Sequence, residues 1–166
     1  MESKQYSTPD ASTLGRSQYE TGTEQRSRLL LIENDPDDAR RAREAFETVA
    51  TETEIEVATD GAAALEFLRE RVEESERIPD LVLLALDLPE VDGFEFLENV
   101  RDDADLVQLP VLVLSDSSAS SDVHESYERA ANAYLSKPSD PDEFETVASA
   151  IDRFWLRRVS LPPHGF

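Results

Sequence analysis

The chain of 166 residues contains no cysteine, and this absence removes several classes of site at once. Disulfide bonds, zinc sites with cysteine ligands, iron–sulfur clusters and thiol nucleophiles are excluded. Glycine is scarce too, with five residues that are not clustered. The sequence therefore has no G-x-G-x-x-G or G-x-x-x-x-G-K-[ST] phosphate loop, which disfavours a nucleotide-binding enzyme.

Long apolar runs are also missing. No segment approaches the roughly 18–20 apolar residues that span a membrane. The N-terminus, Met1-Glu2-Ser3-Lys4, lacks the basic and then apolar segments of a secretory signal. We therefore expect a cytoplasmic protein with no membrane partner.

Positively charged residues are scarce as well. Sixteen Lys and Arg residues face 37 Asp and Glu residues, which gives a net charge of −21. No basic patch offsets this charge, so binding to nucleic acid by counterion release is excluded, and an anionic membrane would repel the chain. Only Lys4 and Lys137 are lysines. An acidic surface poor in lysine resembles that of halophilic proteins, because molar salt shortens the Debye length to ~3 Å and screens the repulsion. The alternative is an acidic protein that is not adapted to high salt.

The apolar pattern predicts three parts. Residues 1–27 are polar and aperiodic, which predicts a disordered N-terminal tail. Residues 28–159 form one domain, and 160–166 a short C-terminal tail. Within the domain, short apolar runs predict strands at Leu29–Ile32, Ile55–Ala58, Leu81–Leu86, Val111–Leu114 and Ala133–Leu135. Helical spacing and start signals predict helices over 37–49, 60–71, 93–102, 121–130 and 141–157.

The alternation of strands and helices predicts an α/β fold with a doubly wound, five-stranded parallel sheet. The third and fourth runs are continuously apolar, which is typical of central strands covered on both faces. Sites in such folds lie at the carboxyl ends of the strands. The residues found there are Glu33, Asn34 and Asp35, then Ala85 and Asp87, then Ser115, and finally Lys137 and Pro138. Carboxylates, a hydroxyl group and one ammonium group are thus expected to converge.

At these positions the sequence resembles the receiver domain of two-component response regulators, closest to single-domain receivers that serve phytochrome-like histidine kinases. The matching pieces are Leu30-Leu31-Ile32-Glu33, Arg43-Glu44-Ala45-Phe46, Pro79-Asp80-Leu81-Val82-Leu83-Leu84, Leu88-Pro89, Asp92-Gly93, Ser126-Tyr127, Ala131-Asn132-Ala133-Tyr134, Lys137-Pro138, Phe154-Trp155-Leu156 and Leu161-Pro162. The resemblance covers about residues 27–163. It implies a flavodoxin-like (βα)5 fold and a role in phosphorelay signalling.

The resemblance also implies site roles. In this family Mg²⁺ and an acidic cluster assist phosphoryl transfer to an Asp, and a Ser or Thr and a Lys then hold the product. Ala85 falls at the phosphoacceptor position and Asn34 at a metal-binding Asp, so two essential groups are missing. Ser115, Tyr134, Lys137 and Pro138 match the switch and phosphate-contact positions, and the bond before Pro138 is usually cis in the family.

We therefore predict a phosphorylation-independent pseudo-receiver with no catalytic residue and no bound metal, acting by protein–protein interaction. Its expected partners are a histidine kinase, another signalling protein or a second copy of the chain, bound through Tyr134, Phe154 and Trp155. One alternative is a working receiver phosphorylated on a surrogate acid such as Asp87, with Asp35 helping to bind metal. Another is an unrelated doubly wound enzyme.

Each retained residue also has a structural interpretation. Lys137 would neutralise Glu33, Asp35 or Asp87 in a crowded acidic pocket. Ser115 would donate to the backbone, and Tyr134 would be a fixed interface aromatic.

Overall fold

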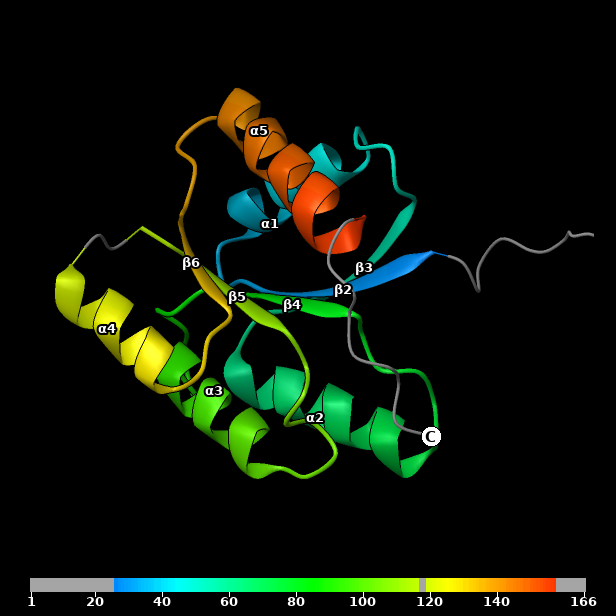
Figure 1. Cartoon of the computed structure of the whole chain (residues 1–166), viewed down its shortest axis with the longest axis vertical. Coiled ribbons are helices and arrows are strands. Elements are labelled where there is room, and N and C mark those ends of the chain that lie inside the picture. The colour runs from blue at the N-terminus through cyan, green and yellow to red at the C-terminus, as the bar shows by residue number, and fades with distance from the viewer. Residues whose placement is uncertain (1–25, 117–118, 158–166) are drawn as a thin grey trace, which may run out of the picture.

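The computed structural model describes residues 26–116 and 119–157. In these ranges five strands form one parallel sheet, in the order β3-β2-β4-β5-β6 (Figure 1). The strands are β2 (Ser27–Ile32), β3 (Thr53–Ala58), β4 (Leu81–Leu84), β5 (Val111–Ser115) and β6 (Ala133–Ser136). The predicted five-stranded parallel sheet is confirmed. Its order places β2, β4 and β5 in the centre, and β3 and β6 at the edges.

Five helices connect the strands. They are α1 (Pro36–Phe46), α2 (Gly61–Glu73), α3 (Gly93–Asp102), α4 (Ser120–Glu128) and α5 (Pro141–Ile151), and α5 continues into a π-helix, η2 (Asp152–Leu156). Helices α1 and α5 lie together on one face of the sheet, while α2 and α3 lie on the other, and α4 lies beside the edge strand β6 (Figure 1). Both faces of the central strands are therefore covered.

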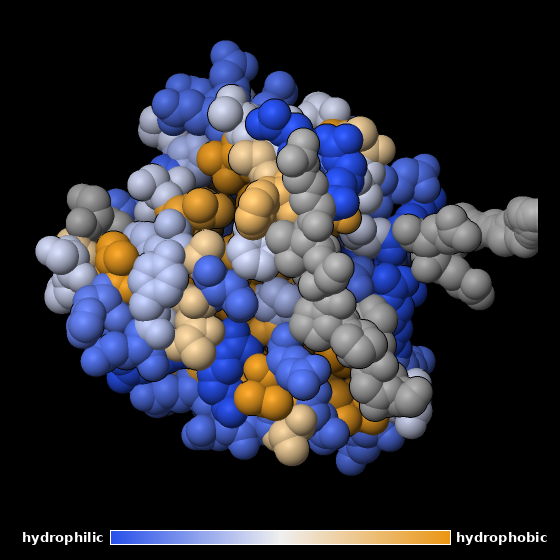
Figure 2. Space-filling model, in the orientation of Figure 1, coloured by the Kyte–Doolittle hydropathy of each residue, from blue (hydrophilic) through white to orange (hydrophobic). Residues whose placement is uncertain are grey.

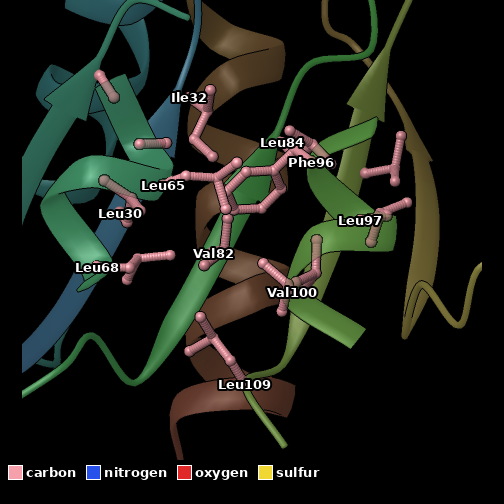
Figure 3. Packing of buried hydrophobic residues seen from close by; sticks show 14 of the residues in the cluster. Leu30, Ile32, Leu65, Leu68, Val82, Leu84, Phe96, Leu97, Val100 and Leu109 are labelled. Atoms are coloured by element: carbon pink, nitrogen blue, oxygen red, sulfur yellow. The ribbon is translucent and has the colours of Figure 1, made fainter. Parts of the chain in front are cut away.

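The core has two parts because successive residues of a strand point to opposite faces. Leu30, Ile32, Val82 and Leu84 pack against Phe96 and other apolar residues of α2 and α3 (Figure 3). The neighbouring residues Leu29, Leu31, Leu81 and Leu83 pack against α1 and α5. Continuous apolar runs are thus needed in these strands, since every position is buried.

Aspartate side chains begin four of the five α-helices. Asp35, Asp60, Asp92 and Asp140 each accept a hydrogen bond from a backbone N–H in the first turn that follows. Such caps satisfy helix N–H groups that have no partner within the helix. The four strand-to-helix turns are fixed in this way, and two of them border the carboxyl end of the sheet's central strands.

Helix α4 differs from the others. Its N-cap residue is Ala119, which makes no side-chain hydrogen bond to the helix, and Ser126 is its one buried residue. The Ser126 hydroxyl donates to the carbonyl of Asp122 at 2.8 Å. The helix therefore contributes little apolar surface to either core cluster.

Several predicted boundaries are wrong by a few residues. Strand β4 ends at Leu84 instead of Leu86, because the chain turns where the N–H of Leu88 donates to the carbonyl of Leu86 at 3.1 Å. Helix α1 begins one residue earlier and ends at Phe46, and α2 extends to Glu73. The last predicted helix is two elements, with the helical hydrogen bonding changing at Asp152.

The predicted tails lie almost entirely outside the described residues. Arg26 and Ser27 are the exceptions, and Ser27 pairs with Thr53 at the start of β2. Within the described ranges, no helix is long and apolar enough to cross a membrane. Hydrophilic residues dominate the face seen in Figure 2, and apolar residues gather between α5 and β6.

Candidate functional site

Strand pairing brings the predicted site residues to one edge of the sheet. Ile32 pairs with Leu84, and Leu84 pairs with Val113, so Glu33 and Ala85 follow adjacent strand ends. Ser115 pairs with Ser136, which precedes Lys137. Backbone hydrogen bonds continue past the strands, from the N–H of Ala85 to Ile32 at 3.0 Å and from that of Lys137 to Ser115 at 2.9 Å. The four strand ends are therefore held in fixed register.

Lys137 lies between two carboxylates at this edge. Its Nζ is 2.8 Å from Glu33 Oε1 and 3.1 Å from Asp38 Oδ2. The Lys137 and Glu33 side chains are 9% and 7% exposed, and that of Asp38 is 16% exposed. Asp38 Oδ1 also lies 3.4 Å from Arg41 Nη1. The ammonium group thus joins the end of β6 to the end of β2 and to the first turn of α1.

The environment changes the proton affinity of Lys137. Burial acts to lower its pKa, but the hydrogen bonds and charges of Glu33 and Asp38 outweigh the burial, and the pKa is raised above the usual value for lysine. The side chain is therefore a cation at every physiological pH. The contact between Lys137 and Glu33 agrees with the structural interpretation, in which Lys137 neutralises neighbouring acids.

The side chains of the predicted acidic pocket make different contacts. Glu33 Oε2 accepts the N–H of Asp35 at 3.0 Å, and Asp35 Oδ1 accepts that of Asp37 at 2.9 Å to cap α1. Asn34 and Asp35 are exposed. Both oxygens of Glu33 thus have a partner. Glu33, Asn34 and Asp35 form a turn in which only the carboxylate of Glu33 is buried.

Ala85 is buried at 6% exposure, directly after the central strand β4. Asp87 is exposed, two residues further along the turn. A hydrogen bond from the N–H of Gly93 to the carbonyl of Leu86, at 3.0 Å, closes the loop that contains Asp87. A Cβ at Gly93 would lie 2.8 Å from the carbonyl oxygen of Ala85, so the loop approaches the strand end too closely for a side chain there. Asp87 therefore lies in this loop, beyond the last residue of β4.

Two predicted residues have buried positions beside this edge. Ser115 ends β5 with 8% exposure, and Pro138 is buried after Lys137. The Lys137–Pro138 bond is trans, as are all peptide bonds of the described residues, so the cis form implied by the resemblance is wrong for this structure. The intrinsic preference of an X–Pro bond also favours trans, by about 0.5–1 kcal/mol.

Comparison with known proteins decides the family. The family model of the response regulator receiver domain matches residues 29–149. The chain belongs to the response regulator receiver domain family. It is 37% identical to response regulator Rcp1 of Synechocystis over 81% of this chain and 92% of that protein. It is 34% identical to a probable methanogenesis regulatory protein, FilR2, of Methanothrix harundinacea over 77% of this chain and 83% of that protein.

Solved structures agree with this membership. The Mn²⁺-bound form of Rcp1 matches with a TM-score of 0.74 and 36% identity, over 82% of this chain and 99% of the other. The phosphorylated cyanobacterial phytochrome response regulator RcpA matches with a TM-score of 0.76 and 33% identity, over 83% and 99%. The protein is thus a response regulator of two-component signalling with the flavodoxin-like receiver fold. Receiver domains generally act in signalling by contact with histidine kinases and other signalling proteins, and the alternative of an unrelated enzyme is discarded.

The receiver family implies a divalent metal at this edge, and the donor set here does not fit one. Mg²⁺ needs several oxygen ligands, of which one or two are usually carboxylates. Each oxygen of Glu33 already has a partner, Lys137 or a backbone N–H, while Asp35 caps α1 and Ala85 offers a methyl group. Within the described part of the chain, no group of three or more Asp, Glu or His side chains is placed to hold a metal ion.

The three predicted interface aromatics of the receiver domain do not form one patch. Tyr134 packs at the border of the core cluster on the α2–α3 side, while Trp155 packs at the border of the α1–α5 cluster. Phe154 is 57% exposed and contacts Trp155 edge to face, with ring centroids 5.8 Å apart. Tyr127 on α4 is also half exposed, and its hydroxyl accepts the N–H of Tyr134 at 3.2 Å. The two groups pack against different core clusters on opposite faces of the sheet.

Sequence reasoning missed Asp38, the second carboxylate on Lys137. The residue occupies the third position of α1, which starts directly above the strand end that carries Glu33. Its first-turn position was a usable signal, because side chains of that turn lie close to the end of the preceding strand.

Proposed function

We propose that this receiver domain transmits its signal by protein–protein contact without being phosphorylated. The observation that carries the proposal is Ala85, a buried methyl group after the central strand, where the family resemblance puts the phosphoacceptor carboxylate. A methyl group has no lone pair and forms no acyl phosphate. Lys137 supports the proposal as well, because its ammonium group is engaged by Glu33 and Asp38.

Asp87 is the competing phosphoacceptor. It is exposed and lies beyond the end of β4. A misplacement of even ~1 Å can cost a positioned reaction about 100-fold in rate. Asp87 lies in the loop that the hydrogen bond between Gly93 and Leu86 closes, and not in the strand. This geometry favours the phosphorylation-independent function.

Acetyl phosphate with Mg²⁺ tests the proposal directly. We expect the wild-type protein to acquire no acid-labile, hydroxylamine-sensitive phosphate, because Ala85 has no carboxylate. Labelling would be followed by intact-protein mass spectrometry. Stoichiometric label that disappears in Asp87→Asn would establish the surrogate-acid function in place of ours.

A companion variant tests whether the remaining pocket is intact. Ala85→Asp with Asn34→Asp restores both missing groups, so we expect metal-dependent binding of beryllofluoride, a mimic of the phosphoryl group. Ala85→Asn combined with Asn34→Asp is the matched control, since it has similar size and no attacking carboxylate. Equal responses of the two variants would refute the assignment of position 85.

We further propose that Phe154, with Trp155 beneath it, forms part of the docking surface for a histidine kinase, another signalling protein or a second copy of the chain. Exposed aromatics are enriched in the centres of interfaces.

Phe154→Ser is expected to weaken association at least tenfold, as the loss of a hot-spot aromatic does. The control is Val107→Ser, which removes another exposed apolar side chain. Val107 lies in the loop that follows α3 and is 43% exposed. Light scattering for the homodimer and kinase pull-down for the other partners distinguish the occupants, and no effect of Phe154→Ser in either would exclude this surface.

A further inference from the structure

The contacts of Lys137 define a small cation-binding pocket that is already filled. Two carboxylate oxygens from different elements, Glu33 on the end of β2 and Asp38 on α1, approach the same nitrogen atom at 2.8 and 3.1 Å. Each of the three side chains is at least four-fifths buried. A cation placed at that nitrogen would contact both carboxylates.

Charge explains why some cation must occupy the pocket. Burying two carboxylates near each other is unfavourable unless a positive charge compensates them. Lys137 supplies that charge, and Arg41 approaches the second oxygen of Asp38 from the outer side at 3.4 Å. The two carboxylates and the two cations balance, so a divalent ion added to this group would create an excess of positive charge.

Tethering decides the competition between the ammonium group and a free ion. Lys137 belongs to the same chain, and the hydrogen bond from its backbone N–H to Ser115 holds β6 in register beside the pocket. An intramolecular group acts at a high effective concentration, typically millimolar or above. A free divalent cation at lower concentration has to displace this group and also lose its own hydration, which Mg²⁺ does reluctantly.

We propose that Lys137 is the resident cation of the Glu33–Asp38 pocket, that it excludes divalent metal from the folded receiver domain when Asn34 and Ala85 supply no carboxylate, and that it keeps β6 fixed to α1. The inference rests on the proposed function, since it explains how the domain persists without the metal that the family implies. It assigns to one lysine both the charge balance and the connection between β2, β6 and α1.

Metal titration of four proteins tests this inference. The wild type, Lys137→Met, Lys137→Arg and the double variant Lys137→Met/Asp38→Asn are titrated with MnCl₂ in the absence of any phosphate donor, with binding followed by the electron paramagnetic resonance of free Mn²⁺. Met removes the charge and retains much of the length, while Arg retains the charge. Nonspecific Mn²⁺ uptake by the acidic surface is fitted as a common linear background, because the net charges of the four proteins differ by at most one unit.

We expect saturable binding of one Mn²⁺ to Lys137→Met, at least tenfold tighter than to the wild type or Lys137→Arg, and its loss in the double variant. Equal binding to the wild type and Lys137→Met, or no specific binding to either, would overturn the inference. Circular dichroism checks that each variant folds. If Lys137→Met is unfolded, the wild-type unfolding temperature with and without 10 mM MnCl₂ becomes the test, and a saturable increase above that of Lys137→Arg would overturn the inference.

The outcome is separable from that of the proposed function. Phosphate labelling reports on an acceptor carboxylate, whereas Mn²⁺ titration reports on the occupancy of the Lys137 pocket. Label on the wild type with no Mn²⁺ binding would refute only the function, and Mn²⁺ binding to the wild type with no label would refute only the role of Lys137.

Discussion

Three residues of the described chain, Ser75, Glu90 and Ala130, hold left-handed backbone conformations without being glycine, with φ of 56°, 62° and 62°. This conformation costs an L-amino acid about 1–2 kcal/mol, because Cβ approaches the following carbonyl oxygen. Glycine avoids the contact but loses more chain entropy on folding, about 0.5–1 kcal/mol. A replacement by glycine at these positions therefore tests the local backbone.

We predict that Glu90→Gly stabilises the receiver domain by about 0.5–1 kcal/mol in urea unfolding. Glu90 lies in the loop between Asp87 and Gly93, and its side chain is exposed. The control Glu90→Ala removes the same charge but keeps Cβ. If Glu90→Ala stabilises the protein as much as Glu90→Gly, relief of charge repulsion is the cause and the backbone argument is wrong.

Ala130→Gly is expected to stabilise by a similar amount, about 0.5–1 kcal/mol. Ala130 follows the C-cap of α4, where glycine is the usual residue of a Schellman motif. The N–H of Ala131 donates to Ser126 and that of Ala130 to Tyr127, each at 2.9 Å, which are the two bonds of that motif. Ala104→Gly, in the exposed loop after α3, gives a comparison without a positive φ, and we expect it to be neutral or destabilising.

At the same scale, the sequence predicted some side-chain contacts and missed others. Lys137 was expected to neutralise acids of the pocket because it follows a strand end, and the contact with Glu33 follows that logic. Asp38 was missed because its partner comes from β6, 99 residues away, and helix-start patterns describe only neighbours in the chain.

Elements were more predictable than residues. Each of the five apolar runs is a strand, and each helix follows its strand, because burial on both faces leaves a clear pattern in residues such as Leu81–Leu84. The residues at which strands and helices end were predicted less accurately. The turn after Leu84 depends on hydrogen bonds to Leu86, and η2 depends on packing of Trp155 and Leu156 against the α1–α5 cluster. Neither interaction has a local sequence signal.

The link between β6 and α1 has a consequence for alkaline stability. The pKa of Lys137 is raised in the folded protein by Glu33 and Asp38, against the opposing effect of burial. Its stabilising contribution is therefore complete below the unfolded-state pKa of about 10.4 and disappears as the pH rises through the higher folded-state value.

We predict that the wild type unfolds at a higher temperature than Lys137→Met at pH 7–9, and that this difference shrinks above about pH 10.5. Taking the difference removes the contributions of all groups that the two proteins share. Thermal unfolding by circular dichroism across this pH series provides the measurement. A difference that is constant up to pH 12 would mean that Lys137 acts through packing and not through its charge.

For the whole molecule, net charge is the dominant electrostatic feature. A charge of −21 on 166 residues produces repulsion that opposes the compact state in dilute buffer. The ion pairs on the surface, such as those of Arg40 and Arg129, are individually weak and only partly offset it. Salt screens the exposed charges over ~3 Å at about 1 M.

We therefore predict a substantial increase in unfolding temperature between low salt and about 2 M potassium chloride. The same series with Lys137→Met should show the same increase, since screening acts on the whole surface. A flat or falling unfolding temperature would contradict the halophilic interpretation of the scarcity of lysine.

The weak burial of α4 implies that amide hydrogen exchange differs between the helices. Ala119 gives the helix no side-chain cap, and its one buried residue, Ser126, is polar. Opening this helix exposes almost no apolar surface, whereas opening α3 exposes Phe96, Leu97 and Val100. Local opening free energies follow such differences in burial. The amides in the first turn of α4 should therefore exchange with deuterium soonest among the five helices, and those of β4 last.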